Sequence, residues 1–410
     1  MKIGQIVPEF PLDTIAHIEP TLLDDVPVGL SDVTAEIAGA AASLGTALHP
    51  RTAAQLADLM RIMNTYYSNL IEGHNTRPRD IARALSGDLD TDEERRNLQL
   101  EAAAHVRVQR EIDRMAADGT LPEPASSEFL CWVHHEFYRN APKAMLEIQG
   151  ASAKFVMEPG AYRSRPEHDN AVGRHVPPSS ERVFAFMQRF EERYSMASLG
   201  KAAGILAIPA AHHRFNYIHP FPDGNGRVSR LISHAMALKA GIGVHGLWSV
   251  SRGLARGLGE GVEGRREYKR MIDHADSPRQ GDLDGRGNLS QKALIEFSEW
   301  FLKTSLDQIT FMTSLFDIAT LDRRLGRLVQ RSETLKPEAA RLLSEALVRG
   351  EFERGAASRV TGLPERSARR VLNEVISAGL LASATPKGPV SLRFPDSALE
   401  TLFPRLFGEP

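Results

Sequence analysis

The segment from His219 to Arg230, with the sequence HPFPDGNGRVSR, gathers the residues of the chain best suited to chemistry. Gly224, Asn225 and Gly226 can adopt left-handed backbone angles at low cost, so their amide groups can converge on an anion. The next predicted helix begins at this point, and the start of a helix presents unpaired N–H donors and a positive dipole end. The segment therefore predicts an anion site, with phosphate as the natural occupant.

Charged side chains around the glycines extend this prediction to a magnesium nucleotide. Arg227 and Arg230 are three positions apart and share one helical face, where two guanidinium groups can grip terminal phosphates. Asp223 supplies a carboxylate beside the phosphate oxygens, which is a common way to hold Mg²⁺. His219 is the side chain of the segment that exchanges a proton near neutral pH, so it could deprotonate an incoming hydroxyl.

Competing chemical sites have weaker support in the sequence. No glycine-rich loop ends in Gly-Lys-Ser or Gly-Lys-Thr, so a P-loop is excluded. His212 and His213, with His219 further along, could form a metal site, but no carboxylate stands at helical spacing to complete it. We therefore expect these two histidines to have structural roles.

Composition indicates an ordinary globular protein with two or three domains. The chain has 410 residues, of which 42% are hydrophobic and 25% charged, and this excludes a disordered or collagen-like chain. Its net charge is -2, so a polyanion would have to be bound by a local basic cluster. One cysteine, no signal peptide pattern and no long apolar run lead us to expect a cytoplasmic protein without membrane contact.

Apolar residues at spacings of three and four predict a mainly α fold. The predicted helices are 52–64, 93–117, 127–138, 181–194, 201–217, 227–240 and 291–315. The stretch 153–176 predicts a short exposed hairpin, because KFVM is followed by a Pro-Gly turn signal. The glycine-rich stretch 253–264 predicts a loop.

The last 85 residues have the pattern of a winged helix-turn-helix. Three short helices are predicted at 337–348, 355–360 and 367–378, followed by a hairpin that ends near residue 394. Arg366, Arg369 and Arg370 lie at the start and on the outer face of the third helix, where a recognition helix meets DNA. Winged helices also serve in dimerisation and protein docking, so both DNA and protein remain candidate partners.

The segment from His219 to Arg230 resembles the full signature of Fic-domain proteins, H-x-F-x-[D/E]-G-N-G-R-x-x-R, with every specified position filled. The resemblance implies a Fic helical core over about 129–302, and PGAYR at 159–163 is similar to the flap that docks a target side chain. It implies transfer of AMP from ATP to a Tyr, Thr or Ser hydroxyl of a target protein, with release of pyrophosphate. His219 is then the base and Asp223 the Mg²⁺ ligand. The phosphate-binding residues implied are Gly224, Asn225, Gly226, Arg227 and Arg230.

A second segment, SNLIEG at 68–73, resembles the inhibitory motif of the family, [S/T]-x-x-x-E-[G/N], through Ser68, Glu72 and Gly73. In proteins that carry both motifs, the glutamate pairs with the second arginine, here Arg230, and keeps ATP from placing its terminal phosphate for attack. We therefore expect an autoinhibited adenylyltransferase that can also modify itself. The expected domains are an N-terminal helical region with the inhibitory motif (1–110), the Fic catalytic core (111–325) and the winged helix-turn-helix (326–410).

Two other functions remain as alternatives. The chain could be a DNA-binding transcriptional regulator in which the Fic core senses nucleotide, although the intact His219 favours catalysis. The same site could instead remove AMP, with Glu72 orienting a water. The target protein and the oligomeric state stay open, and a homodimer is compatible with the sequence.

Overall fold

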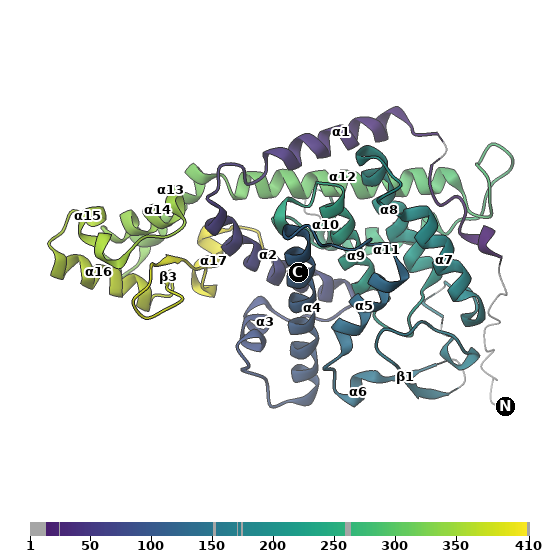
Figure 1. The fold of residues 1–410 in the computed structure, drawn as a ribbon, viewed down its shortest axis with the longest axis horizontal. Coiled ribbons are helices and arrows are strands. Elements are labelled where there is room, and N and C mark those ends of the chain that lie inside the picture. The colour runs from purple at the N-terminus through teal and green to yellow at the C-terminus, as the bar shows by residue number, and fades with distance from the viewer. Residues whose placement is uncertain are drawn as a thin grey trace.

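The computed structural model describes residues 14–407, apart from residues 24, 151–152, 170, 174 and 259–263. These residues form a mainly helical structure with two small two-stranded sheets, which confirms that the fold is mainly α (Figure 1). None of the helices in the described part of the chain combines the length and apolar content that crossing a bilayer requires.

The α-helices, in chain order, are α1 (Val28–Ser43), α2 (Pro50–Ile71), α3 (Pro78–Leu85), α4 (Glu93–Ala117), α5 (Ser127–Tyr138), α6 (Lys143–Leu146), α7 (Val183–Tyr194), α8 (Lys201–Ile218), α9 (Asn225–Lys239), α10 (Val250–Arg256), α11 (Gly264–Ala275), α12 (Gln291–Leu315), α13 (Ile318–Arg331), α14 (Ala339–Arg349), α15 (Ala357–Thr361), α16 (Glu365–Ser377) and α17 (Asp396–Leu402). The strands are β1 (Glu147–Gln149), β2 (Lys154–Val156), β3 (Leu381–Ala382) and β4 (Ser391–Leu392). Single 3₁₀ turns are η1 (Ile15–Ile18), η2 (Pro166–His168), η3 (Ser180–Arg182), η4 (Val244–Gly246) and η6 (Arg354–Ala356).

Several predicted helices have the expected bounds because their first residues are capped. The side chains of Asp92, Ser126 and Ser290 each accept a hydrogen bond from a backbone N–H of the first helical turn, at 3.0, 3.2 and 3.0 Å. Such caps satisfy donors that have no partner inside the helix. Helices α4, α5 and α12 therefore begin and end where the apolar periodicity predicted.

The antiparallel pair α8 and α9 lies in the middle of the helical body and carries the signature segment in its connecting loop. Helices α2, α4 and α5 pack against α9, and α7 and α12 pack against α8. Helix α1, which the sequence analysis did not predict, runs along α12 on the upper side of Figure 1. Its buried positions, Leu30, Val33, Ile37 and Ala41, follow helical spacing, but its many small residues make the stripe weak.

The predicted hairpin exists, but it has a different partner strand. Lys154–Val156 pairs with the preceding Glu147–Gln149 in antiparallel register, with Ile148 opposite Phe155. The turn signal at Pro159-Gly160 does not fold this strand back on itself. Instead, the Gly160 amide donates to the His134 ring at 2.8 Å, which ties the flap to α5.

The loop predicted at 253–264 is wrong over its first residues, which continue α10 to Arg256. Gly253 lies within α10, where this helix packs closely on α12: a Cβ at this position would clash with Thr304 and would lie 2.9 Å from Gln308. The glycine is therefore required by a close contact between helices. In the sequence alone, such a glycine cannot be distinguished from one that marks a turn. Residues 259–263 lie outside the described part of the chain.

Helices α13–α17 with the β3–β4 hairpin form the C-terminal lobe (residues 318–402), which projects to the left in Figure 1. The three helices predicted here correspond to α14, α15 and α16, and the predicted hairpin to β3 and β4, where Leu381 pairs with Leu392. The assignment of this lobe as a winged helix-turn-helix, and the three-domain division of the chain, stay predictions. The segment after α17 returns to the helical body, where Leu406 is fully buried.

The packing of α1 on α12 gives a stability prediction. Ile37→Ala removes a fully buried side chain from this contact and should lower the free energy of unfolding by about 2–5 kcal/mol. The adjacent Glu36 is exposed, so Glu36→Ala should change it by no more than about 0.5 kcal/mol. Chemical denaturation of the two variants checks this, and equal midpoints would contradict the packing described for α1.

Candidate active site

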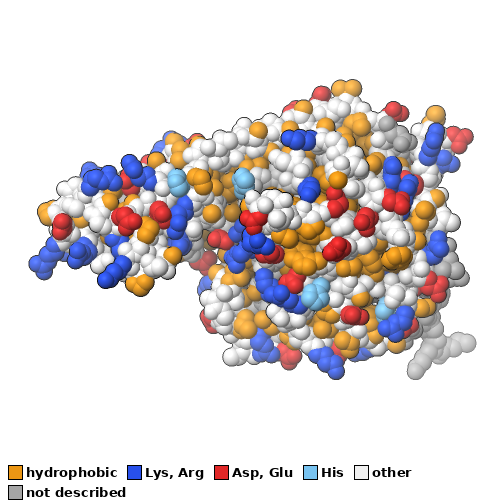
Figure 2. All heavy atoms as spheres, viewed as in Figure 1, with side chains coloured by type: hydrophobic (Ala, Val, Ile, Leu, Met, Phe, Trp, Pro, Cys, Tyr) orange, Lys and Arg blue, Asp and Glu red, His pale blue; other side chains and the backbone are white. Residues whose placement is uncertain are grey.

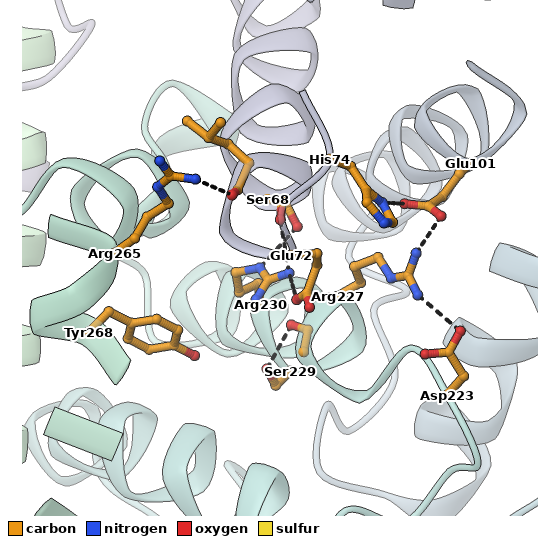
Figure 3. A network of polar contacts seen from close by, with 12 residues as sticks. Ser68, Glu72, His74, Glu101, Asp223, Arg227, Ser229, Arg230, Arg265 and Tyr268 are labelled. Carbon is orange, nitrogen blue, oxygen red and sulfur yellow. Dashed lines mark hydrogen bonds and ion pairs between the residues drawn. The ribbon is translucent and has the colours of Figure 1, made fainter. Parts of the chain in front are cut away.

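An ion pair between a buried arginine and a partly exposed glutamate joins the two predicted motifs (Figure 3). The Nη2 atom of Arg230 lies 2.6 Å from Oε1 of Glu72, and the Arg230 side chain is only 1% exposed. Ser68 supplies two further acceptors: its hydroxyl accepts from Arg230 Nε at 2.9 Å and its carbonyl from Nη2 at 3.2 Å. Two of the three nitrogens of the Arg230 guanidinium group therefore donate to residues at the end of α2.

The position of Glu72 follows from how α2 ends. Glu72 is the last residue before Gly73, whose φ of 93° lies in the left-handed region that glycine tolerates best. The Gly73 amide donates back to the Leu70 carbonyl at 3.1 Å, and Arg265 donates to the same carbonyl at 3.2 Å. Burial alone would raise the pKa of the Glu72 carboxyl, but the charges of Arg230 and Arg227 outweigh it, so the pKa is lowered. Glu72 is thus held as an anion.

The Glu72 carboxylate also lies over the first turn of α9. A Cβ added to Gly226 would clash with Glu72 Oε1 and would lie 3.2 Å from Arg230 Nη1. The first amides of a helix attract anions, and here a carboxylate stands above them. Gly226 is therefore needed for the close approach of an anion to the helix backbone.

The loop that precedes α9 is held by its own side chains. Gly224 has a φ of 79° and lies against the Tyr138 ring, so a Cβ at this position would approach the Tyr138 hydroxyl to 2.8 Å. Asn225 bonds both backbone groups of Phe221: its amide donates to the Phe221 carbonyl at 2.7 Å and its oxygen accepts from the Phe221 amide at 2.9 Å. Gly224 and Asn225 therefore shape the loop, whereas Gly226 leaves room at its end.

Arg227 belongs to a separate polar chain that the sequence analysis did not predict (Figure 3). Its Nη1 atom pairs with Glu101 at 2.6 Å, and its Nη2 atom contacts the Tyr138 hydroxyl at 2.9 Å and Asp223 at 3.3 Å. Burial alone would raise the pKa of Glu101, but the charge of Arg227 and the hydrogen bond from His74 outweigh it and lower the pKa to about 2. The Nε atom of Arg227 is buried and has no hydrogen-bond partner within the described residues.

The residues around Asp223 fit a magnesium ion that arrives with phosphates. Mg²⁺ usually takes only one or two protein carboxylates and keeps water and phosphate oxygens as its other ligands. The Asp223 side chain is 46% exposed, and its Oδ2 atom also accepts from Tyr138 at 3.0 Å. The described residues contain no group of three or more His, Cys, Asp or Glu side chains that could hold a metal on its own. The donor set is thus suited to an ion shared with a nucleotide.

His219 lies at the end of α8, at the entrance of the same loop. Its φ of 50° places it in the left-handed region, which is rare for a residue other than glycine and ends the helix sharply. Burial, followed by the charge of Arg163, lowers the pKa of His219 to about 3, while a hydrogen bond with the Asn216 backbone opposes this shift. The imidazole is therefore neutral at pH 7 and able to accept a proton.

Arg163, from the segment predicted to be the flap, fastens that segment to the loop. Its Nε atom donates to the His219 carbonyl at 2.7 Å, and its Nη2 atom donates to the Ile218 carbonyl at 3.0 Å. Nη1 of Arg163 pairs with Asp169 at 2.7 Å, and both side chains are buried. The predicted flap segment is therefore connected directly to the backbone that carries His219.

His134 makes a second connection between flap and loop. Its Nδ1 atom accepts from the Gly160 amide at 2.8 Å, which leaves Nε2 to donate to the Asp223 carbonyl at 3.2 Å. Its ring stacks on Phe221 with centroids 4.0 Å apart. Burial lowers the pKa of His134 to about 3, so the ring is a neutral bridge.

His212 and His213, the two histidines of the alternative metal site, have structural partners. His212 contacts the Ser233 hydroxyl at 2.9 Å and the Tyr268 hydroxyl at 2.8 Å. His213 lies 2.9 Å from the carboxylate of Asp276, the residue that follows α11. Both rings are buried and belong to the packing of α8.

The structure thus brings the predicted residues together. Ser68 and Glu72 lie against the first turns of α9, and His219 lies at the start of the loop that leads into α9. The site residues that sequence reasoning missed are Glu101, Tyr138, His134 and the neighbouring His74. They come from α4, α5 and the turn after α2, and they carry no motif of their own. Arg163 was in the predicted flap segment, but its role as a fastening to the loop had no local signal.

Residues 124–237 match the model of the Fic/DOC family. The "Protein adenylyltransferase Fic" of Drosophila erecta is 34% identical over 85 residues, which are 21% of this chain and 17% of that protein. The protein of the same name from Drosophila grimshawi is 39% identical over 70 residues, which are 17% of this chain and 14% of that protein. The chain thus spans only a small part of the length of these curated relatives.

The fold has a counterpart among solved structures. The crystal structure of a Fic family protein from Desulfovibrio desulfuricans G20 superposes with a TM-score of 0.50 at 17% sequence identity, and the match covers 90% of this chain and 98% of that one. At this identity the match concerns the fold alone. Residues 124–237, which include α8 and most of α9, are therefore a Fic domain.

Proposed function

We propose that this chain is an autoinhibited protein adenylyltransferase that transfers AMP from ATP to a hydroxyl side chain of a target protein. The observation that carries the proposal is the loop between α8 and α9, with a neutral His219 at its start and an anion position over Gly226 at its end. The names of the Drosophila relatives support the same chemistry. The modified residue in the target is a Tyr, Thr or Ser.

Each residue of the loop has one task in this reaction. His219 takes the proton of the target hydroxyl while the hydroxyl oxygen attacks the α-phosphorus of ATP and pyrophosphate leaves. The phosphates approach the first turn of α9, with Arg230 as their principal side-chain donor, and their negative charge raises the basicity of His219. Asp223 would hold Mg²⁺, which when bound stabilises the charge on the phosphate oxygens.

In the proposed inhibited state, Glu72 occupies the place of the terminal phosphate. Two observations support this assignment: Glu72 pairs with Arg230 at 2.6 Å, and it lies over Gly226. A carboxylate in this position excludes a phosphate, because like charges repel. ATP must then displace Glu72 or bind with its phosphates out of line, and basal transfer is slow. Self-modification is an expected side reaction of the released form.

DNA binding by the C-terminal lobe is a second candidate function. Arg366, Arg369 and Arg370 are exposed on α16, and the first two have no ion pair within the described residues. Figure 2 shows Lys and Arg side chains gathered along the outer edge of this lobe. Free guanidinium groups on a helix behind a short turn are suited to phosphate contacts.

The first prediction tests the base. His219→Ala should lower AMP transfer by about 10²- to 10⁴-fold while ATP affinity changes by no more than a few-fold, because the base acts on the target hydroxyl and not on the phosphates. The measurement is incorporation of labelled AMP from ATP and Mg²⁺ into a cell lysate and into the chain itself. Transfer at the parent rate would exclude His219 as the base, and no transfer by the parent or its Glu72→Gly form would exclude the activity.

The second prediction tests autoinhibition. A charge-assisted hydrogen bond contributes about 1.5–3 kcal/mol, so Glu72→Gly should raise the initial rate of AMP incorporation at least about tenfold. The double variant with Arg230→Ala should remain poorly active, because it also loses a phosphate donor.

Asp118→Gly is a matched control for Glu72→Gly. Asp118 ends α4 as Glu72 ends α2, precedes a left-handed glycine and pairs with an arginine, Arg114, at 2.7 Å on the surface. Its substitution should leave the rate unchanged. A rate for Glu72→Gly that equals or falls below the parent rate would contradict autoinhibition, and faster loss of bound AMP from the parent than from Glu72→Gly would favour AMP removal instead.

The third prediction concerns DNA. The full chain should bind duplex DNA in a salt-dependent manner, and joint replacement of Arg366, Arg369 and Arg370 by Gln should reduce the slope of log K against log salt by about three. Replacement of three exposed arginines of α4 by Gln, at positions 95, 110 and 114, is the control. Fluorescence anisotropy at low salt checks this, and absence of binding by the parent would remove DNA as a partner.

A further inference from the structure

Helix α2 contacts the C-terminal lobe at one end and the candidate active site at the other. Its 22 residues span about 33 Å at 1.5 Å per residue. Near its start, the buried Thr52 hydroxyl donates to the Leu347 carbonyl of α14 at 2.9 Å, and Arg51 pairs with Glu351 at 3.0 Å. Near its end lie Ser68 and Glu72, which hold Arg230.

A second contact reaches α2 beside the site itself. The Tyr67 hydroxyl donates to the Leu406 carbonyl at 3.1 Å, and Leu406 belongs to the segment that follows the lobe. The buried Arg252 of α10 holds the same segment, with donation to the Arg405 carbonyl at 2.8 Å and to the Leu406 carbonyl at 3.4 Å. Tyr67 and Ser68 are consecutive, so one residue of α2 binds the C-terminal segment and the next binds Arg230.

We propose that the C-terminal lobe and the segment after it regulate adenylyl transfer by setting how firmly α2 presents Glu72 to Arg230. The inference rests on the proposed function and adds its regulatory element. A hydrogen-bonded helix moves as one body, so a shift at Thr52 or Tyr67 displaces Ser68 and Glu72 with it. The two states are α2 seated, with Glu72 on Arg230, and α2 displaced, with Arg230 free for a phosphate. A ligand that binds the lobe more tightly when α2 is displaced would activate the enzyme. The size of the activation would follow the ratio of the ligand's affinities for the two states.

Two conservative substitutions in the full chain test the proposal. Tyr67→Phe removes only the hydroxyl on Leu406, whose carbonyl keeps its bond from Arg252, and Thr52→Val removes the bond to Leu347 without a change in volume. Each should raise AMP incorporation about two- to tenfold, the range expected for one hydrogen bond, and should tighten binding of a fluorescent ATP analogue by a similar factor. In a Glu72→Gly background neither should raise the rate further, because their effect passes through Glu72.

Tyr194→Phe is the matched control. It removes the same kind of buried hydroxyl-to-carbonyl bond, from Tyr194 to Thr21 at 2.7 Å, but at a place that α2 does not touch. It should leave both the rate and the nucleotide affinity at parent values.

Three outcomes would overturn the proposal: unchanged rate and affinity in both α2 variants, an equal rise in the Glu72→Gly background, or an equal rise in Tyr194→Phe. The affinity measurement separates this inference from the proposed function. If no form transfers AMP, the proposed function fails, and tighter analogue binding by Tyr67→Phe but not by Tyr194→Phe still supports control of Arg230 through α2.

Discussion

A guanidinium group buried at the start of a helix needs an anion, and Arg230 is such a group. With 1% of its side chain exposed, it would be costly to leave without acceptors, and Ser68 and Glu72 supply them from α2. Only a ligand with its own negative charge can replace Glu72 and keep Arg230 in an ion pair. In the proposed function, the contact that completes this part of the fold is therefore the same contact that a nucleotide displaces.

The two arginines of the signature segment differ in how freely they can serve a ligand. Arg227 is held by Glu101, whose pKa is lowered to about 2, and by Tyr138, so its charge is already balanced within the protein. Its buried Nε atom is the donor that lacks a partner among the described residues. The Nη2 atom of Arg230, by contrast, loses its anionic partner when Glu72 leaves. Arg227 thus shapes and charges the loop, and Arg230 is the arginine whose availability is conditional.

The sequence predicted what is local and missed what is not. Helices α4, α5 and α12 could be bounded from apolar spacing, and the loop from His219 to Arg230 could be identified because its residues are contiguous. Glu101 and Tyr138 could not be found, because their contacts join segments 126 and 89 residues apart with no pattern in either. The hairpin prediction failed in its pairing for a similar reason: Gly160, the glycine of its turn signal, donates its amide hydrogen to His134 of α5. Local signals identify turns, whereas tertiary contacts decide what the turns connect.

The proposed base, His219, and the anion position are supported by different parts of the fold. His219 has its left-handed backbone held by Arg163, and His134 and Tyr138 fix Asp223 from α5. None of these bonds is made by a residue of α2, which meets the site through Ser68 and Glu72 alone among the bonds described above. Displacement of α2 therefore removes an anion from Arg230 while the strained backbone of the base and the flap keep their own supports. In the proposed function, such a site is inhibited and released without reassembly of the groups that would perform the transfer.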